Sequence, residues 1–246
     1  AFMHGIHDGG VLTCAKHFPG HGDTDKDSHK TLPLINHSRE RLDSIDLLPF
    51  KYLIQQGVGS VMVAHLNIPS LDTTNNRAST LSPYIVDTLL QQELGFRGLV
   101  FTDALNMKGV SNFYNSGELE VAAIHAGNDV LLFSKNVPKA FKAIHQAIKD
   151  SVLTEDRISK SCHKILKAKE WLGLHKLAVL DTLDVLNKVQ NNTTDLLIQR
   201  LEAAALTVLK NTDDEIPFRE LKNKKIAVLS IGDKNSEAFY TQLKRY

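Results

Sequence analysis

The chain has 246 residues, 42% of them hydrophobic, which is enough for one large globular domain or for one and a half smaller ones. Its 29 basic and 28 acidic residues give a net charge of +1 and form no long blocks, so no charged field is available to hold nucleic acid or an anionic membrane surface. No apolar run approaches the roughly 20 residues of a membrane-spanning helix. The two cysteines show neither metal-ligand spacing nor a disulfide framework.

Four short apolar runs predict the strands of a parallel sheet. Each run is continuous rather than alternating in polarity, which is typical of strands that are buried on both faces. Segments with helical periodicity separate the runs, so the order is β-α-β-α. The predicted strands are residues 11–15, 60–64, 99–102 and 129–133, and the helices between them are residues 39–56, 83–94 and 118–126.

Polar residues follow each predicted strand directly. A (β/α)8 barrel builds its active site at the C-terminal ends of its strands, and an open doubly wound sheet binds ligands there as well. The barrel is favoured because such residues recur after every strand instead of at one switch point. The residues are Lys16 and His17, His65 and Asn67, Asp103 and Asn106, and Ser134 and Lys135.

The number of βα units predicts a partial barrel, because a complete barrel needs eight and four are visible. We expect the C-terminal half of a (β/α)8 TIM-type barrel over residues 1–174, with its N-terminal half missing and with helices at 137–152 and 154–174 closing it. A helical linker over 175–210, with a helix at 195–205, is predicted to follow. Residues 211–246 then begin a second, truncated α/β domain, with a buried strand at 226–231.

The segment from Lys16 to Pro33 packs three histidines and three aspartates into a glycine-bearing loop after a strand. In an extended stretch, side chains two apart point the same way, so Asp27 and His29 can act on one substrate atom together. A carboxylate beside an imidazole fixes its tautomer and lets it give and take a proton near neutral pH. A single loop histidine is often only a surface residue, but the density of such residues favours a site.

A second candidate is Asp103, which ends an otherwise apolar strand. Burying a carboxylate there is costly unless it has a partner or faces a wet cleft, so we expect it to face the cleft. An aspartate can attack an anomeric carbon if a proton donor stands beside the leaving oxygen. The alternative interpretation is a helix N-cap after the strand, because aspartate is a favoured cap.

These residues resemble glycoside hydrolase family 3, and specifically its β-N-acetylglucosaminidase branch. The resemblance runs from about Gly10 to Gly173, and the strand near Ile226 looks like the start of the sandwich domain that lies behind the barrel in two-domain members. The motifs that carry it are Lys16-His17-Phe18-Pro19-Gly20-His21-Gly22, Asp27-Ser28-His29 with Leu32-Pro33, Val63-Ala64-His65 with Ile68-Pro69, and Phe101-Thr102-Asp103.

The resemblance implies a retaining β-N-acetylhexosaminidase that releases terminal β-linked N-acetylglucosamine, for example from fragments in peptidoglycan recycling. Asp103 would be the nucleophile, His29 the general acid/base and Asp27 its partner, while Lys16 and His17 would hold sugar hydroxyls. Carbohydrate is the only partner implied, without a cofactor or a metal. Some relatives use phosphate as the acceptor, so phosphorolysis is an alternative. The upstream Arg and Asp that grip the aminosugar in the family are expected in the preceding half-barrel.

Two other classes of protein compete with the glycosidase. A metal-dependent barrel hydrolase would use side chains of the kind that zinc binds, although no His-x-His pair ends the first strand. Its ligands would come from His17, His21, His29, His65 and Asp103. A non-catalytic sugar-binding module would retain Lys16 and His17 but would not need Asp103 and His29. The sequence leaves the compartment open between the bacterial cytoplasm and the cell envelope or periplasm.

Overall fold

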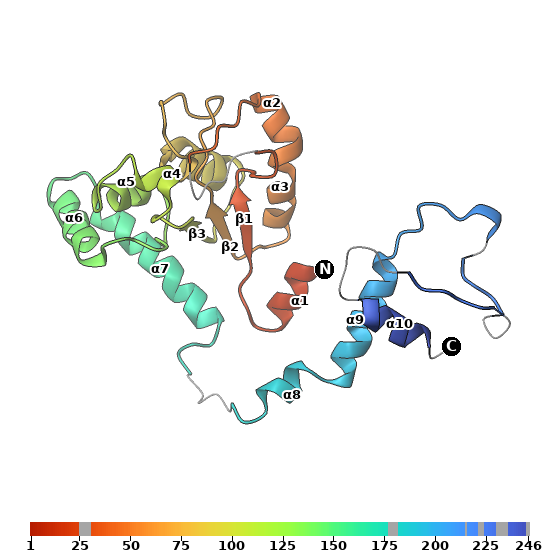
Figure 1. Ribbon diagram of the computed structural model, residues 1–246. Helices are drawn as coiled ribbons and strands as arrows, with labels where there is room; N and C mark the ends of the chain where they lie inside the picture. Colours follow the sequence, from red (N-terminus) through yellow and green to blue (C-terminus); the bar gives the residue numbers. More distant parts are fainter. Residues whose placement is uncertain (25–30, 177–181, 215, 221–223, 230–235, 245–246) are drawn as a thin grey trace. The chain divides into compact units, whose positions relative to one another are not determined.

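The computed structural model describes residues 1–24, 31–176, 182–214, 216–220, 224–229 and 236–244. The chain divides into two units, Ala1–Ala178 and Val179–Tyr246. The first unit is built on a three-stranded parallel sheet in the order β1 (Cys14–Phe18), β2 (Ser60–Val63) and β3 (Leu99–Thr102). Figure 1 shows the three strands side by side, with helices α2 and α3 on the β1 side and α5 to α7 on the other side.

The helices of the first unit follow the predicted periodicity. The predicted helix at 39–56 is present as three consecutive helical pieces, and its N-terminus is capped by the Ser38 hydroxyl, which accepts from the Arg41 N–H at 3.3 Å. The helices are α1 (Phe2–Asp8), α2 (Arg39–Arg41), η1 (Leu42–Asp46), α3 (Leu48–Gln55), η2 (Ser79–Leu81), η3 (Tyr84–Glu93), α4 (Lys108–Ser111), α5 (Glu118–Ala126), α6 (Val137–Lys149) and α7 (Glu155–Trp171).

The strands β2 and β3 confirm the continuous apolar runs. Val61, Val63 and Val100 are fully buried in the hydrophobic core, whereas Met62 and Phe101 are half-buried. The first strand begins at Cys14 rather than at residue 11, because Thr13 is held by α1. Both the N–H and the hydroxyl of Thr13 contact the His7 ring Nε2, at 3.4 and 2.7 Å.

The fourth predicted strand, 129–133, is reduced to a single parallel bridge between Val130 and Phe101. The regular ladder is interrupted because the Leu132 N–H donates to the Thr102 side-chain Oγ1 at 3.0 Å instead of to a backbone carbonyl. Phe133 then takes a positive φ of 49°, which ends the extended conformation. The run therefore lies beside β3, as predicted, without forming a regular strand.

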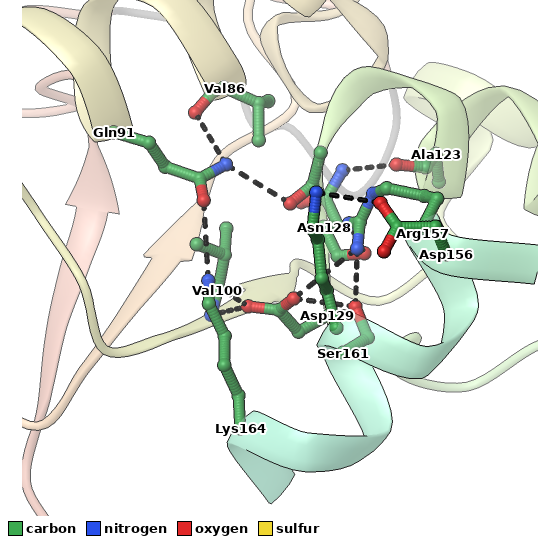
Figure 2. Close-up of polar contacts among 12 residues, drawn as sticks. Val86, Gln91, Val100, Ala123, Asn128, Asp129, Asp156, Arg157, Ser161 and Lys164 are labelled. Carbon is green, nitrogen blue, oxygen red and sulfur yellow. Dashed lines mark hydrogen bonds and ion pairs between the residues drawn. The ribbon is translucent and has the colours of Figure 1, made fainter. Parts of the chain in front are cut away.

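The buried carboxylate of Asp129 joins α7 to β3, and Figure 2 shows the polar groups that converge on it. Its Oδ2 accepts from the Val100 N–H at 3.0 Å and from Lys164 Nζ at 2.9 Å. Its Oδ1 accepts from the Ser161 hydroxyl at 2.6 Å, and Arg157 Nη1 lies 3.6 Å away. These residues are called the Asp129 cluster below. A buried charge is tolerated where opposite charges and hydrogen bonds surround it, so the cluster fixes α7 on the sheet.

The second unit contains α8 (Val185–Val189), α9 (Asn192–Ala205), η4 (Thr212–Asp214) and α10 (Ser236–Leu243). The strand predicted at 226–231 is absent over residues 226–229, and residues 230 and 231 lie outside the described ranges. A strand forms only with a hydrogen-bonded neighbour. Within the described residues no strand pairs with 226–229, and the side chains of Ile226 and Leu229 are exposed.

Across the parts of the chain that the structure describes, no helix combines the length and the apolar character needed to cross a membrane.

Candidate active site

Asp103 lies directly after β3, at the C-terminal edge of the sheet. Its N–H donates to the Val63 carbonyl of β2 at 2.9 Å, which extends the pairing of the two strands by one residue. Its side-chain Oδ1 accepts from the N–H of the next residue, Ala104, at 2.8 Å. The N-cap interpretation of Asp103 is wrong, because α4 begins at Lys108 and Met107 is its N-cap.

His17 faces Asp103 across the central strand. Parallel strands end at one edge of a sheet, and β1 and β3 flank β2 there. His17 Nε2 lies 4.0 Å from Asp103 Oδ2, and the side chains are 32% and 16% exposed. The two oxygens of the carboxylate are therefore different: Oδ1 is held by the backbone, and Oδ2 faces an imidazole and solvent.

Lys16 precedes His17 in β1 and is exposed. Both residues, together with His21, line a hollow of about 320 Å³ between the end of β1 and the helices η1 and α3. Gly20 shapes this edge, because its φ is +141° and an added Cβ would lie 2.8 Å from the Cβ of Asp46. Both the backbone conformation and the space therefore require glycine at this position of the loop.

Asp27 and His29 lie in residues 25–30, outside the described residues, but the flanks of this interval are anchored. On the upstream side, Asp23 Oδ2 lies 2.9 Å from both His37 Nε2 and Arg41 Nη2. On the downstream side, the segment that begins at Pro33 pairs with Asn67, whose N–H donates to the Pro33 carbonyl at 2.8 Å and whose carbonyl accepts at 2.9 Å. The upstream flank is thereby tied to residues at and before α2, and the downstream flank to the segment that follows β2.

His65 follows β2 and is fully buried. Its Nδ1 lies 2.8 Å from the Thr80 hydroxyl, and its Nε2 lies 3.1 Å from the Ala104 carbonyl. Burial lowers the pKa of His65 below its ordinary value, against the opposite effects of the Ala104 carbonyl and the Asp103 charge. Because both ring nitrogens have partners, His65 is engaged inside the fold and does not offer a nitrogen to a metal.

The metal-hydrolase interpretation therefore loses one of its ligands. Among the residues that the structure describes, no group of three or more His, Cys, Asp or Glu side chains is arranged to hold a metal ion. The histidines that remain from that set and are described are His17, beside Asp103, and His21, whose Nδ1 lies 2.8 Å from the Thr24 hydroxyl.

Sequence reasoning missed the polar run that supports this edge. Ser79, Thr80 and Ser82 are all fully buried. The Ser79 hydroxyl donates to the Ala64 carbonyl at 2.6 Å, and the Thr80 hydroxyl also lies within hydrogen-bond distance of that carbonyl. The only signal in the sequence is a Ser-Thr-x-Ser run before a proline, which by itself is typical of a helix start.

Residues 1–168 match the sequence profile described as the glycosyl hydrolase family 3 N-terminal domain, a TIM-barrel-like α/β fold. The chain belongs to this family, which confirms the resemblance found in the sequence. A β-hexosaminidase A from Pseudoalteromonas piscicida is 33% identical over 248 residues, covering 92% of this chain and 40% of that protein.

Solved structures show the same relationship. A glycoside hydrolase family 3 β-N-acetylglucosaminidase from Paenibacillus sp. str. FPU-7 is 37% identical with a TM-score of 0.75, and the match covers 81% of this chain and 38% of that one. A β-glucoside phosphorylase bound to 2FGlc is 25% identical with a TM-score of 0.77, covering 87% of this chain and 40% of that one. The chain thus spans about two fifths of the length of these relatives.

Proposed function

We propose that this chain carries the catalytic centre of a retaining β-N-acetylhexosaminidase that releases terminal β-linked N-acetylglucosamine from glycans such as peptidoglycan fragments. Asp103 is the nucleophile, His29 is the general acid/base, and Asp27 orients it. Lys16 and His17 bind sugar hydroxyls. Support comes from the family membership and from the names of the relatives, which include β-hexosaminidases and a β-N-acetylglucosaminidase.

The observation that carries the proposal is the asymmetric environment of Asp103. A nucleophilic carboxylate needs one oxygen fixed and the other directed at the reacting carbon. Oδ1 accepts a backbone hydrogen bond at 2.8 Å, while Oδ2 faces His17 at the partly exposed edge of the sheet. His17 brings hydrogen-bonding groups to the place where the sugar ring would contact the nucleophile.

The reaction proceeds in two steps with one proton moved in each. Asp103 Oδ2 attacks the anomeric carbon while His29 gives its proton to the departing glycosidic oxygen, which leaves a glycosyl-enzyme ester. His29 then takes a proton from water as that water attacks the same carbon, and the ester bond to Asp103 breaks. Two displacements at one carbon return the original β configuration.

The first unit contributes only part of the barrel in this proposal. We infer that residues 1–174 form the C-terminal half of a (β/α)8 barrel, that 175–210 link it onward, and that 211–246 begin a second α/β domain. The three-stranded parallel sheet, with candidate residues on all three C-terminal strand ends, supports the first of these statements.

The test is hydrolysis of a chromogenic β-N-acetylglucosaminide by the complete protein that carries this chain, beside its Asp103→Gly and His29→Ala variants. We expect both variants to lose activity. Azide should restore turnover of Asp103→Gly by entering the vacated space, and the product should be the α-glycosyl azide, because only one displacement then occurs. Activity that persists in Asp103→Gly without azide would contradict the nucleophile assignment.

The acceptor is tested in the same assay. The phosphorylase among the structural relatives makes inorganic phosphate a second candidate acceptor. We expect the free sugar to be the main product when phosphate is added at millimolar concentration. A sugar 1-phosphate as the main product would assign the protein to phosphorolysis instead, with the same nucleophile. A chelator should leave the rate unchanged, and a loss of activity with chelator would support the metal-dependent alternative.

A further inference from the structure

His65 is the one histidine that the structure describes as fully buried, and the catalytic roles proposed above do not use it. It lies at the end of β2, between the strand that carries His17 and the strand that leads to Asp103. A buried imidazole is costly unless both nitrogens are satisfied, so its two contacts carry information about its protonation.

The partners determine which ring nitrogen carries the proton. The Ala104 carbonyl can only accept, so Nε2, which lies 3.1 Å from it, must be the donor. The Thr80 hydroxyl lies 2.8 Å from Nδ1, and it also donates toward the Val63 carbonyl at 3.2 Å and lies within hydrogen-bond distance of the Ala64 carbonyl. The Ala64 carbonyl accepts from the Ser79 hydroxyl and the Val63 carbonyl from the Asp103 N–H.

Both ring nitrogens of His65 therefore have a polar neighbour inside the fold. Removal from water disfavours the charged imidazolium and lowers the pKa of His65. The charged groups that face the ring are Asp103 and His17, whose effects on it oppose each other. His65 therefore donates from Nε2 to the Ala104 carbonyl, while burial disfavours the charged form of its ring.

The Nε2 donor of His65 contacts Ala104, whose own N–H holds the side chain of the proposed nucleophile, Asp103. Ala104 is held at both ends, with its carbonyl on His65 Nε2 and its N–H on Asp103 Oδ1. The Asp103 N–H is in turn held by the Val63 carbonyl. Residues at the end of β2 thus hold both the N–H of Asp103 and the carbonyl of Ala104.

We propose that His65 is a positioning residue for the nucleophile: supported by Thr80, it holds the Ala104 carbonyl so that Asp103 Oδ1 stays on the Ala104 N–H and Oδ2 points at the sugar. This role rests on the proposed function of Asp103. It predicts that loss of His65 slows formation of the covalent intermediate without weakening sugar binding, because a small misplacement of an attacking atom costs rate rather than affinity.

The experiment measures covalent labelling of the complete protein by a 5-fluoro derivative of N-acetylglucosaminyl fluoride, followed by intact mass and by peptide mapping of the labelled residue. The saturation constant of labelling reports binding and the limiting rate constant reports attack. His65→Leu removes both hydrogen bonds. His65→Gln places an amide N–H near the position of Nε2 and is the conservative variant. Thr80→Val removes the supporting hydroxyl at nearly constant volume.

Ser79→Ala is the matched control, because Ser79 is equally buried in the same turn and bonds the backbone of Ala64 and Leu66 instead of the His65 ring. We expect the limiting rate constant to fall about 100-fold in His65→Leu and about 10-fold in Thr80→Val, with little change in the saturation constant. His65→Gln should recover most of the rate, and Ser79→Ala should label at nearly the rate of the unchanged protein.

Three results would overturn the role of His65, and each is distinct. If the label is on Asp103 and the limiting rate constant is unchanged in His65→Leu, the positioning role is wrong and the nucleophile assignment stays intact. If His65→Leu does not fold, an unchanged limiting rate constant in Thr80→Val leads to the same conclusion. An equal fall of the limiting rate constant in Ser79→Ala and Thr80→Val shows that any change in this turn slows labelling, whether or not it affects His65. A label on another residue overturns the proposed nucleophile and this role with it.

Discussion

Asp103 and Asp129 are two aspartates that the same strand, β3, helps to hold, one at each of its ends. The Asp129 side chain is 1% exposed and receives hydrogen bonds from the Val100 N–H, the Ser161 hydroxyl and Lys164, with Arg157 nearby. The Asp103 side chain is 16% exposed and, among the described residues, has one backbone N–H at 2.8 Å and His17 at 4.0 Å.

This difference separates a carboxylate held by fixed partners from one whose surroundings suit the proposed role of nucleophile. Asp129 has its negative charge neutralised by fixed partners, so its electron pairs are already used in holding α7. Asp103 keeps one oxygen directed at a partly open edge, where a substrate can replace solvent. Asp103 and Asp129 are the same residue type and lie at similar distances from β3. The difference between them is therefore the number and rigidity of the hydrogen-bond donors around each carboxylate.

The largest expected effect is the loss of turnover in Asp103→Asn. An amide has the shape of the carboxylate but is a poor nucleophile, so we expect kcat to fall by roughly 10³-fold or more. The free energy of unfolding should change little, because the side chain is not surrounded by fixed charges. Steady-state kinetics and urea denaturation of the same preparation check both statements. If Asp103→Asn retained most of its kcat, the proposed difference in role between Asp103 and Asp129 would be contradicted.

Asp129→Asn should give the opposite result. Removing the charge leaves Lys164 and Arg157 without their shared partner, so we expect the free energy of unfolding to fall by about 3–5 kcal/mol. The kcat of the folded fraction should be unchanged, because the Asp129 cluster lies away from the C-terminal edge. Denaturation midpoints and active-site titration measure the two quantities. A specific loss of kcat at full folding would mean that the cluster also serves the site.

The pH dependence of stability tests the buried His65. Its pKa is lowered by burial, so below the ordinary value of about 6.5 the unfolded chain takes up a proton that the folded chain does not. Stability is therefore complete above about pH 6.5 and falls as the pH drops toward the folded pKa, by at most about 1.4 kcal/mol per pH unit from this group. Urea denaturation between about pH 7 and pH 5 should show a smaller slope in His65→Gln. Equal slopes would mean that the folded state accepts the proton.

The smallest effect is expected at an exposed ion pair on α7. Lys160 Nζ lies 2.6 Å from Asp156 Oδ2, but the two side chains are 70% and 71% exposed. Water and salt screen such a pair, so Lys160→Gln should lower the free energy of unfolding by no more than about 0.5 kcal/mol. The same helix carries Lys164, which makes Lys164→Met a matched comparison. Similar losses in both variants would remove the distinction between the exposed pair and the Asp129 cluster.

Much of the first unit could be predicted because its signals are local. The apolar runs of β2 and β3 need no knowledge of their neighbours, and the helix over residues 39–55 follows from periodicity and from Ser38. The run at 129–133 could not be predicted in detail, because the Thr102 side chain intercepts a backbone donor from another segment. No pattern in the sequence reports such a contact.

The candidate site also contains residues that local sequence signals could predict and residues that they could not. Asp103 could be selected as a candidate because a carboxylate at the end of an apolar strand is conspicuous by itself, and its catalytic role stays a prediction. The role of His65 depends on Thr80 and Ala104, which lie 15 and 39 residues away. Hydrogen bonds between such distant segments leave no periodic signal, so the sequence indicated His65 only as a polar residue at a strand end, as part of the motif Val63-Ala64-His65 and as a candidate metal ligand.

The anchored flanks of residues 25–30 have a consequence for protein engineering. Asp23 is tied to His37 and Arg41, and the segment at Pro33 is tied to Asn67, by contacts that involve none of the intervening residues. A peptide from another family member can therefore be grafted between these anchors without rebuilding the scaffold that carries Asp103. The fold thus offers a cassette in which the proposed proton donor and its neighbours can be exchanged as one piece, while Asp103 stays where it is.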